Sequence, residues 1–146
     1  LGNDASLHVN GGEANLLGTS SDRVLMTRID VGYYEILVEN GGSISAEHTD
    51  FEYINGRGLN IYPDGNIAGS QPFNHCSFQQ TESGGILLQV NNSQDLGLWN
   101  VDFPANTWSG ANNVKKENYA GNLTMIHATG GFAGPGIKSR LWIVLE

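Results

Sequence analysis

Apolar and polar residues alternate over many short stretches of this chain, and each stretch ends within a few residues. The segments 6–9 and 123–126 show the alternation, which is typical of a strand with one buried face. Gly-Gly, Asp-Gly or Asn-Asn pairs break the chain at 11–12, 41–42, 64–65, 84–85, 91–92 and 112–113. Between such breaks, no window of about 11 residues has the i, i+3, i+4, i+7 spacing of an amphipathic helix. The pattern therefore predicts short strands joined by tight turns.

One short phrase recurs at nearly even intervals. It reads HTDFEY at 48–53, HCSFQQ at 75–80 and NVDFPA at 100–105, so Phe51, Phe78 and Phe103 lie 27 and 25 residues apart. Phe132, in GGFAG, continues the series more loosely, 29 residues further on. Repeat units are predicted at about 31–58, 59–85, 86–113 and 114–136, with a fainter unit at 5–30 and a C-terminal capping strand at 139–146.

A unit of this length with short strands and no helix cannot bury its apolar side alone. Stacking successive units makes each strand one rung of a parallel sheet, about 4.8 Å from the next rung. Equivalent residues then lie above one another, which predicts an inward stack of Phe51, Phe78 and Phe103. The prediction is an all-β, single-domain right-handed parallel β-helix of about five coils over residues 1–146. A β-sandwich also has many short strands, but it does not explain the shared register of the repeats.

Composition and charge narrow the classes of partner. Only 15% of the residues are charged, 20 are glycine, and the net charge is -8 with a pI near 4.8. Such a charge disfavours nucleic acid and anionic membranes as partners. A single cysteine, Cys76, excludes a disulfide within the chain, and no apolar run is long enough for a membrane span. Because the chain opens on Leu1 and closes on Leu145-Glu146, we expect a fragment of a longer protein with neighbouring modules.

The repeated segments also resemble a known group of proteins. ENGGSISAEHTDFEYINGRGLNI, FNHCSFQQTESGGILLQVNN, NVDFP, NNVKK and HATGGFAG are similar to the right-handed parallel β-helix repeats of large secreted bacterial surface proteins, often cargo of the type IX secretion route. The resemblance covers roughly residues 31–136. It implies a secreted or cell-surface location, and the class includes adhesins, sugar-binding modules and polysaccharide lyases or hydrolases. Phage tail fibres and tailspikes use similar solenoids.

The positions between the inward residues are expected to point outward, because strand side chains alternate. They form ladders of polar residues that suit the repeating hydroxyls of an extended polysaccharide. A solvated outer surface, and a metal or catalytic site built on the two histidines, are the alternatives. Trp108, in a polar loop, is the candidate for stacking on a sugar ring, whereas Trp99 is predicted to lie in the core and Trp142 in a last strand or cap. The candidate ligand-binding residues are His48, Asp50, Glu52, His75, Ser77, Gln79, Asn100, Asp102 and Trp108.

Motifs for catalysis are missing from the sequence. GGFAGPG has no lysine and no following helix pattern, so it is not a phosphate loop, and no GxSxG occurs. A lyase would need a base, and the central cations Arg57, Lys115 and Lys116 form no clear constellation. No catalytic residue and no cofactor is predicted, and calcium is not indicated by a motif.

The expected function is a non-catalytic carbohydrate-binding or adhesion module that binds a polysaccharide or cell-surface glycan, without nucleic acid or membrane insertion. A fragment of a β-helical polysaccharide lyase or hydrolase, or a structural segment of a phage tail fibre or spike, is the alternative.

Overall fold

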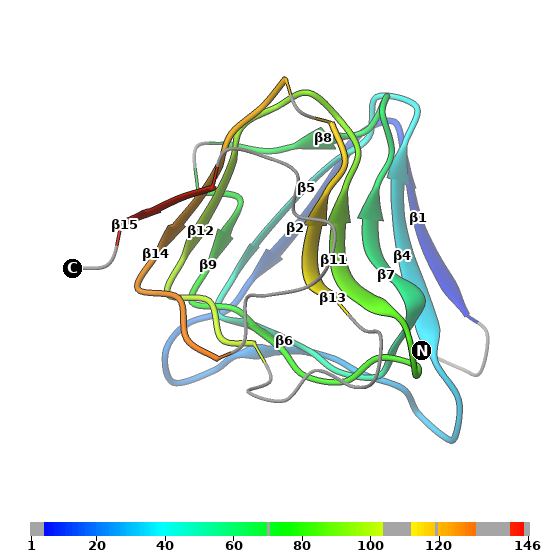
Figure 1. Cartoon of the computed structure of the whole chain (residues 1–146). Coiled ribbons are helices and arrows are strands. Elements are labelled where there is room, and N and C mark those ends of the chain that lie inside the picture. The colour runs from blue at the N-terminus through cyan, green and yellow to red at the C-terminus, as the bar shows by residue number, and fades with distance from the viewer. Residues whose placement is uncertain (1–4, 70, 104–111, 119, 131–140, 145–146) are drawn as a thin grey trace.

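The computed structural model describes residues 5–69, 71–103, 112–118 and 120–130, and the backbone of 141–144 (Figure 1). Every regular element in these residues is a β-strand. They contain no helix long and apolar enough to cross a membrane.

Three parallel sheets wrap around one core (Figure 1). The first sheet contains β1 (Ser6–Asn10), β4 (Tyr34–Glu39), β7 (Ile54–Ile61), β11 (Ile86–Val90) and β13 (Asn112–Lys116). The second contains β2 (Glu13–Leu17), β5 (Ser43–Glu47), β8 (Asn66–Ile67), β9 (Phe73–Asn74), β12 (Leu96–Trp99), β14 (Leu123–Ile126) and β15 (Leu141–Val144). The third contains β3 (Val24–Met26), β6 (Thr49–Phe51) and β10 (Ser77–Phe78).

The chain visits the sheets in a fixed order, so each circuit lays one strand onto the equivalent strand of the circuit before. The first circuit runs through β1, β2 and β3, the second through β4, β5 and β6, and the pairing between circuits is parallel in all three sheets. The predicted parallel β-helix of about five coils is thereby confirmed. A β-sandwich, which would pair its strands antiparallel, does not describe these residues.

The predicted aromatic stack occupies the core. Phe51, Phe78 and Phe103 are buried, and successive ring centroids lie 4.8 and 5.4 Å apart with the rings nearly parallel. Phe73 packs against Phe78 edge-on, at 6.1 Å. The core thus contains both near-parallel stacking and an edge-to-face contact, the second of which is an arrangement that aromatic rings prefer.

Small residues two positions before these rings also point inward, as predicted. Thr49, Cys76 and Val101 are buried. The Thr49 hydroxyl donates to the Leu16 carbonyl at 2.9 Å, and the Cys76 thiol donates to Ala46 at 3.4 Å. Each polar group is thus satisfied by a carbonyl of the preceding coil, so the column can lie inside the core.

The corner between the second and third sheets is built on left-handed residues. His48, His75, Asn100 and His127 have φ values of 47°, 51°, 53° and 51°. Non-glycine residues rarely adopt this conformation, and Asn and His are among those that tolerate it best. The left-handed residue and the residue before it both point outward, whereas the residue after it is buried or, at Ala128, partly buried, so strict alternation fails at this point.

Trp99 shows the consequence. It pairs with Asn74 and Ile126, whereas the preceding Leu98 pairs with the buried Phe73. Trp99 is therefore an outward residue and partly exposed, and the prediction that it lies in the core is wrong. Simple alternation with Val101 and Phe103 would place Trp99 inward, but the left-handed Asn100 breaks that alternation.

The fourth copy of the phrase lies earlier than predicted. Asp102 forms a bridge with Thr129, which places Gly130, not Phe132, in register with Phe103. The phrase is therefore HATG, from His127 to Gly130, and Phe132 lies outside the described residues. Gly130 has a φ of 88°, and a Cβ there would meet the Phe103 carbonyl oxygen at 1.8 Å, so a phenylalanine does not fit at this position.

Two further predictions concern a boundary between repeat units and the C-terminal strand. The predicted boundary between 58 and 59 falls inside β7, and β15 forms within the predicted capping segment by pairing with β14. Whether that strand protects the C-terminal end of the solenoid stays a prediction.

Candidate functional site

Three neighbouring columns of outward side chains run along the solenoid axis where the second sheet meets the third. We name them the acid column (Asp50, Ser77, Asp102 and Thr129), the corner column (His48, His75, Asn100 and His127) and the strand-end column (Leu17, Glu47, Asn74, Trp99 and Ile126). Their alignment follows from parallel pairing, which sets each member one coil beyond the last.

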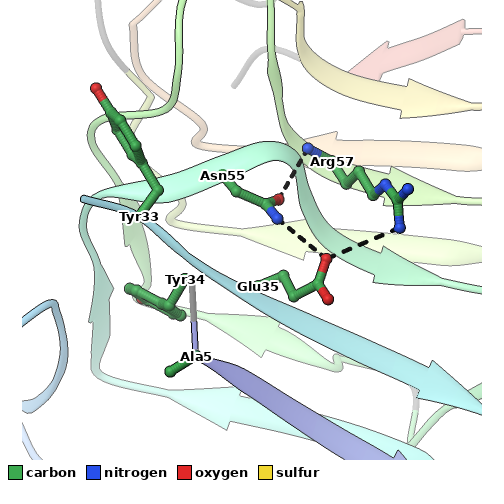
Figure 2. A pocket seen from close by; sticks show the side chains of 6 residues that line it. All are labelled: Ala5, Tyr33, Tyr34, Glu35, Asn55 and Arg57. Atoms are coloured by element: carbon green, nitrogen blue, oxygen red, sulfur yellow. Dashed lines mark hydrogen bonds and ion pairs between the residues drawn. The ribbon is translucent and has the colours of Figure 1, made fainter. Parts of the chain in front are cut away.

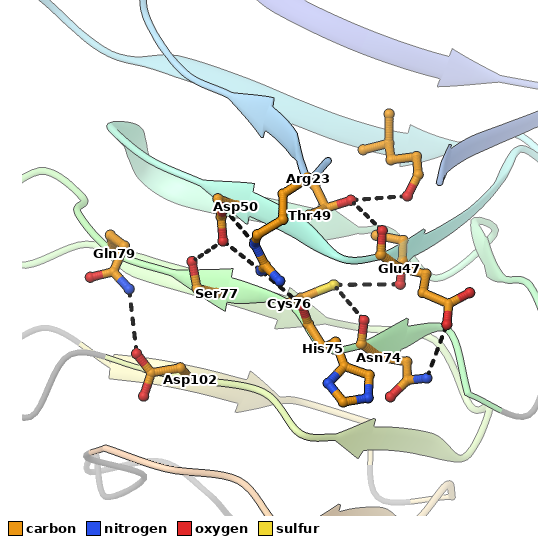
Figure 3. Close-up of polar contacts among 12 residues, drawn as sticks. Arg23, Glu47, Thr49, Asp50, Asn74, His75, Cys76, Ser77, Gln79 and Asp102 are labelled. Atoms are coloured by element: carbon orange, nitrogen blue, oxygen red, sulfur yellow. Dashed lines mark hydrogen bonds and ion pairs between the residues drawn. The ribbon is translucent and has the colours of Figure 1, made fainter. Parts of the chain in front are cut away.

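The acid column lies on the third sheet and on the isolated bridges that continue it, and its members form hydrogen bonds in pairs; Figure 3 shows the pair of Asp50 and Ser77. The Ser77 hydroxyl donates to Asp50 at 2.6 Å, and the Thr129 hydroxyl donates to Asp102. The Gln79 amide lies 3.5 Å from the second oxygen of Asp102. Most hydrogen-bonding capacity of this column is therefore used within the protein.

Arg23 closes the acid column at its N-terminal end. Its guanidinium donates to both Asp50 oxygens, at 2.8 and 2.6 Å, and to the His75 carbonyl at 2.8 Å. This bidentate contact lowers the pKa of Asp50, with the hydrogen bonds from Arg23 as the largest cause, and it raises the pKa of Arg23. Asp50 is therefore held as a carboxylate, and Arg23 fixes the first coil to the second and third.

The corner column is a ladder of planar side chains. The imidazoles of His48 and His75 stack with centroids 4.7 Å apart and an angle of 9° between the rings. The Asn100 amide lies 3.3 Å from His75 Nε2 and donates to the Asn74 side chain at 3.2 Å. His48 Nδ1 is buried and has no hydrogen-bond partner among the described residues. His127 continues the same corner one coil further.

The strand-end column contains a partly exposed aromatic side chain. A Cβ at Gly97 would lie 1.6 Å from Cζ3 of Trp99, so the indole ring covers Gly97 on the outer side of β12. The neighbouring coil contributes Asn74, whose amide donates to Glu47 at 3.4 Å. Trp99 is thus an aromatic ring that lies against the sheet with amide and carboxylate groups beside it.

A shallow depression continues this surface toward the N-terminal coils. Its volume is about 310 Å³. It is lined by Leu17, Ser45, Ala46, Glu47, Ala68, Gln71 and Asn74. Leu17 is 64% exposed, which leaves an apolar side chain at the end of the depression. Trp99 and this depression meet at Asn74, so the surface spans several coils.

The structure brings most of the predicted residues together. His48, His75 and Asn100 form the corner column, and Asp50, Ser77 and Asp102 belong to the adjoining acid column. Glu52 and Gln79 lie beyond it on the same side of the solenoid, where Glu52 accepts from Thr27 at 3.3 Å. Trp108 lies outside the described residues.

Sequence reasoning missed Arg23, Glu47, Asn74, Trp99 and His127. His127 begins a fourth copy of the phrase and was detectable by spacing alone. Trp99, Asn74 and Glu47 each precede a corner residue, so they become outward only once the left-handed corner is known. Arg23 gave no signal, because its coil has a longer connection and no phrase.

Few side chains among the described residues are suited to metal binding or acid–base chemistry. They contain no group of three His, Cys, Asp or Glu side chains placed to hold a metal ion. Lys115 pairs with Glu117, and Lys116 is buried and donates to the Asn92 carbonyl at 2.9 Å, where burial lowers its pKa. Burial also raises the pKa of the Cys76 thiol to about 11, which makes it a poor nucleophile.

Comparison with known proteins gives no family and no relative. No protein-family model matches the chain, and neither a curated protein nor a solved structure matches it.

Proposed function

We propose that this protein is a non-catalytic glycan-binding module of a secreted or cell-surface protein. A polysaccharide chain lies along the solenoid axis, over the strand-end column and the adjoining corner column. The observation that carries the proposal is the position of Trp99, whose ring lies on Gly97 at the outer side of β12 beside Asn74. The net charge of -8 suits a neutral polysaccharide better than a polyanion.

The chemistry of this surface fits a sugar polymer. An indole ring offers a flat apolar face to the C–H groups of a pyranose, while amide, imidazole and carboxylate groups match its hydroxyls. Glu47, Asn74, His75 and Asn100 supply those groups on successive coils. The coils repeat about every 4.8 Å, which is close to the length of one sugar unit in an extended chain.

The acid column serves the fold rather than the ligand in this proposal. Asp50, Ser77 and Asp102 already share hydrogen bonds with one another, with Arg23 or with Thr129. A ligand would have to displace those bonds, and exchanging one hydrogen bond for another yields little free energy. The hydrogen bonds within the corner and strand-end columns are longer, at 3.2 to 3.4 Å, and Trp99 adds an aromatic face there, so we assign contact with the glycan to these two columns.

Three observations favour a binding module over a lyase or hydrolase fragment. A general acid requires a carboxyl group with a raised pKa, whereas the pKa values of Asp50 and Glu35 are lowered. Lys116 lies inside the core, and Lys115 is paired with Glu117. These groups are thus arranged for structure and not for proton transfer.

The test is a calorimetric titration with neutral hexasaccharides: cellohexaose, mannohexaose, xylohexaose, maltohexaose and chitohexaose. We expect one of them to bind with modest affinity, and Trp99→Ala to weaken it about five- to tenfold, the equivalent of about 1 kcal/mol or more. Tyr62→Ala is the matched control, because it removes a partly exposed aromatic ring beyond the end of β7.

Gly97→Ala is a second test of the same site, because it keeps the indole ring but fills the space over Gly97 in which the ring lies. The added methyl group collides with the ring and must displace it, so binding should fall as in Trp99→Ala. Binding that survives in both variants contradicts the proposed site. If none of the five glycans binds, the solenoid is instead a structural segment of a larger assembly, such as a fibre.

A further inference from the structure

A bulge in the first sheet forms a second concave surface, away from the three columns. Tyr34 pairs with Ile54, but Ile36 pairs with Leu59, so the single residue Glu35 faces the four residues 55–58. Bulges of this kind often stand beside functional sites, because they redirect side chains out of the sheet.

The sequence Asn55-Gly56-Arg57-Gly58 fixes the shape of the bulge. The Asn55 side chain accepts from the Arg57 backbone at 2.9 Å, and the Gly56 backbone donates to Glu82 at 2.7 Å. Gly58 has a φ of 70°, and a Cβ there would lie 2.2 Å from the Ile86 carbonyl oxygen, so glycine is required. The bulge is therefore held in place and presents the Arg57 side chain, which is 66% exposed, to solvent.

The concave surface has a volume of about 320 Å³ (Figure 2). Its lining comprises Ala5, Tyr33, Tyr34, Glu35, Asn55 and Arg57. Tyr34 is buried, and Figure 2 shows the partly exposed Tyr33 on the side of the pocket away from Arg57. A cavity of this size, with an aromatic ring and several planar polar groups, is suited to a small polar ligand.

Glu35 and Arg57 stand across from each other without a direct hydrogen bond. Arg57 lies 4.0 Å from Glu35, beyond hydrogen-bonding range, whereas Ser6 and Asn55 donate to Glu35 at 2.8 and 3.0 Å. Burial acts to raise the pKa of Glu35, but these two hydrogen bonds and the charge of Arg57 lower it overall. Glu35 is thus an ionised acceptor with unused lone pairs, and Arg57 is a donor with unused N–H groups.

We propose that this pocket binds one neutral sugar unit through a pair of adjacent hydroxyl groups. A hydroxyl can either donate or accept, so one hydroxyl of the pair can donate to Glu35 while its neighbour accepts from Arg57. Tyr33, at the far side of the same pocket, is the partly exposed aromatic side chain available to the apolar side of the sugar. The inference rests on the proposed function, since it adds a pocket for a single sugar, such as a chain end or branch, to the extended surface at Trp99.

The charge arrangement selects against ionised sugars. A carboxylate on the ligand could bind Arg57 but would face Glu35, and an ammonium group could bind Glu35 but would face Arg57. The net charge of -8 further disfavours an anionic ligand at long range. Among sugars of similar shape, the neutral one should therefore bind best.

The experiment is an NMR titration that follows the backbone amides of Asn55, Gly56 and Arg57. The probes are glucose, galactose, mannose and N-acetylglucosamine, with glucuronate and glucosamine as charged analogues. At least one neutral sugar should shift these amides in a saturable way, with a dissociation constant on the order of millimolar. Arg57→Ala should weaken that binding about tenfold. The change is at an exposed side chain, so an unchanged urea midpoint verifies that the fold is retained.

Two further variants separate the possible results. Arg57→Lys keeps the charge but loses the planar fork, so it should restore only part of the affinity. Trp99→Ala should leave sugar binding at this pocket unchanged. If no neutral sugar shifts these amides, or if glucuronate binds more tightly than glucose, the pocket assignment is wrong. If no neutral sugar binds this pocket but hexasaccharide binding still depends on Trp99, the proposed function stands without the pocket. If a neutral sugar binds the pocket but no hexasaccharide binds at Trp99, only the pocket stands.

Discussion

Replacing Phe78 with alanine tests the aromatic stack that holds the coils in register. Phe78 is fully buried, and its ring contacts Phe51 at 4.8 Å, Phe103 at 5.4 Å and Phe73 at 6.1 Å. Removing a buried phenylalanine side chain costs about 3–5 kcal/mol through lost transfer free energy and the cavity left behind. Each lost aromatic contact adds about 0.5–1.5 kcal/mol beyond the buried area. The measured range of about 3–5 kcal/mol already includes such contacts, so three of them place the expected loss at its upper end, about 5 kcal/mol.

The assay is urea unfolding followed by far-ultraviolet circular dichroism. A protein of this kind has about 5–15 kcal/mol of stability in total, so Phe78→Ala should be either unfolded or barely folded. Phe78→Leu keeps most of the apolar volume and should lose only about 1–2 kcal/mol. Tyr62→Ala, at a partly exposed position, serves as the control and should lose less than about 1 kcal/mol.

The ranking of the three variants by their loss of unfolding free energy tests this reasoning. The reasoning holds if the loss increases from Tyr62→Ala through Phe78→Leu to Phe78→Ala, with the urea dependence of the free energy of unfolding unchanged among the folded variants. It is refuted if Phe78→Ala unfolds within about 1 kcal/mol of the parent, because a ring shared by three coils cannot be removed at so small a cost.

Three further predictions concern pH and the backbone. The pKa of Cys76 is raised from 9.0 to about 11, so its contribution to stability is present below pH 9 and is lost as the pH rises to about 11. The variant Cys76→Val should therefore lose about 2–3 kcal/mol less stability than the parent over this pH range, as measured by urea unfolding at each pH. The pKa of Asp50 is lowered below 3.8, so its contribution is lost as the pH falls through that lowered value; Arg23→Ala should move acid unfolding to higher pH and lower neutral stability by about 1 kcal/mol. Gly130→Ala should destabilise the protein by about 1–3 kcal/mol, because the position has a positive φ and faces the Phe103 carbonyl. The first prediction fails if Cys76→Val loses as much stability at alkaline pH as the parent. The second fails if Arg23→Ala unfolds in acid at the same pH as the parent, and the third fails if Gly130→Ala is as stable as the parent.

The fold could be predicted because its cause lies in the repeat. Parallel coils place equivalent residues above one another, so the even spacing of Phe51, Phe78 and Phe103 reports the register directly. The inward column that includes Cys76 followed from the same alternation. Within the series of Phe anchors, Phe132 was misassigned, because a glycine in a left-handed conformation replaces phenylalanine in the fourth phrase.

The candidate site could be predicted only in part, because it depends on backbone conformations that leave little trace in the sequence. Histidine adopts the left-handed conformation more often than most non-glycine residues but only in a small minority of cases, so the identities of His48 and His75 alone did not indicate a corner that turns Trp99 outward. The bulge that presents Arg57 inserts residues into one coil alone and therefore has no counterpart in the repeat. Such local departures from alternation determine which side chains reach the surface, whereas the repeat determines which side chains form the core.

The most direct test of the glycan-binding surface is a map of backbone amide shifts during titration with the five neutral hexasaccharides. One glycan is expected to shift the amides of residues 47–48, 74–75, 99–100 and 126–127 together, because these pairs lie one coil apart along the strand-end and corner columns. The amides of Asp50, Ser77 and Asp102 on the third sheet should move much less. Shifts centred on the third sheet, shifts scattered over unrelated coils, or no shift with any of the five glycans would contradict the proposal.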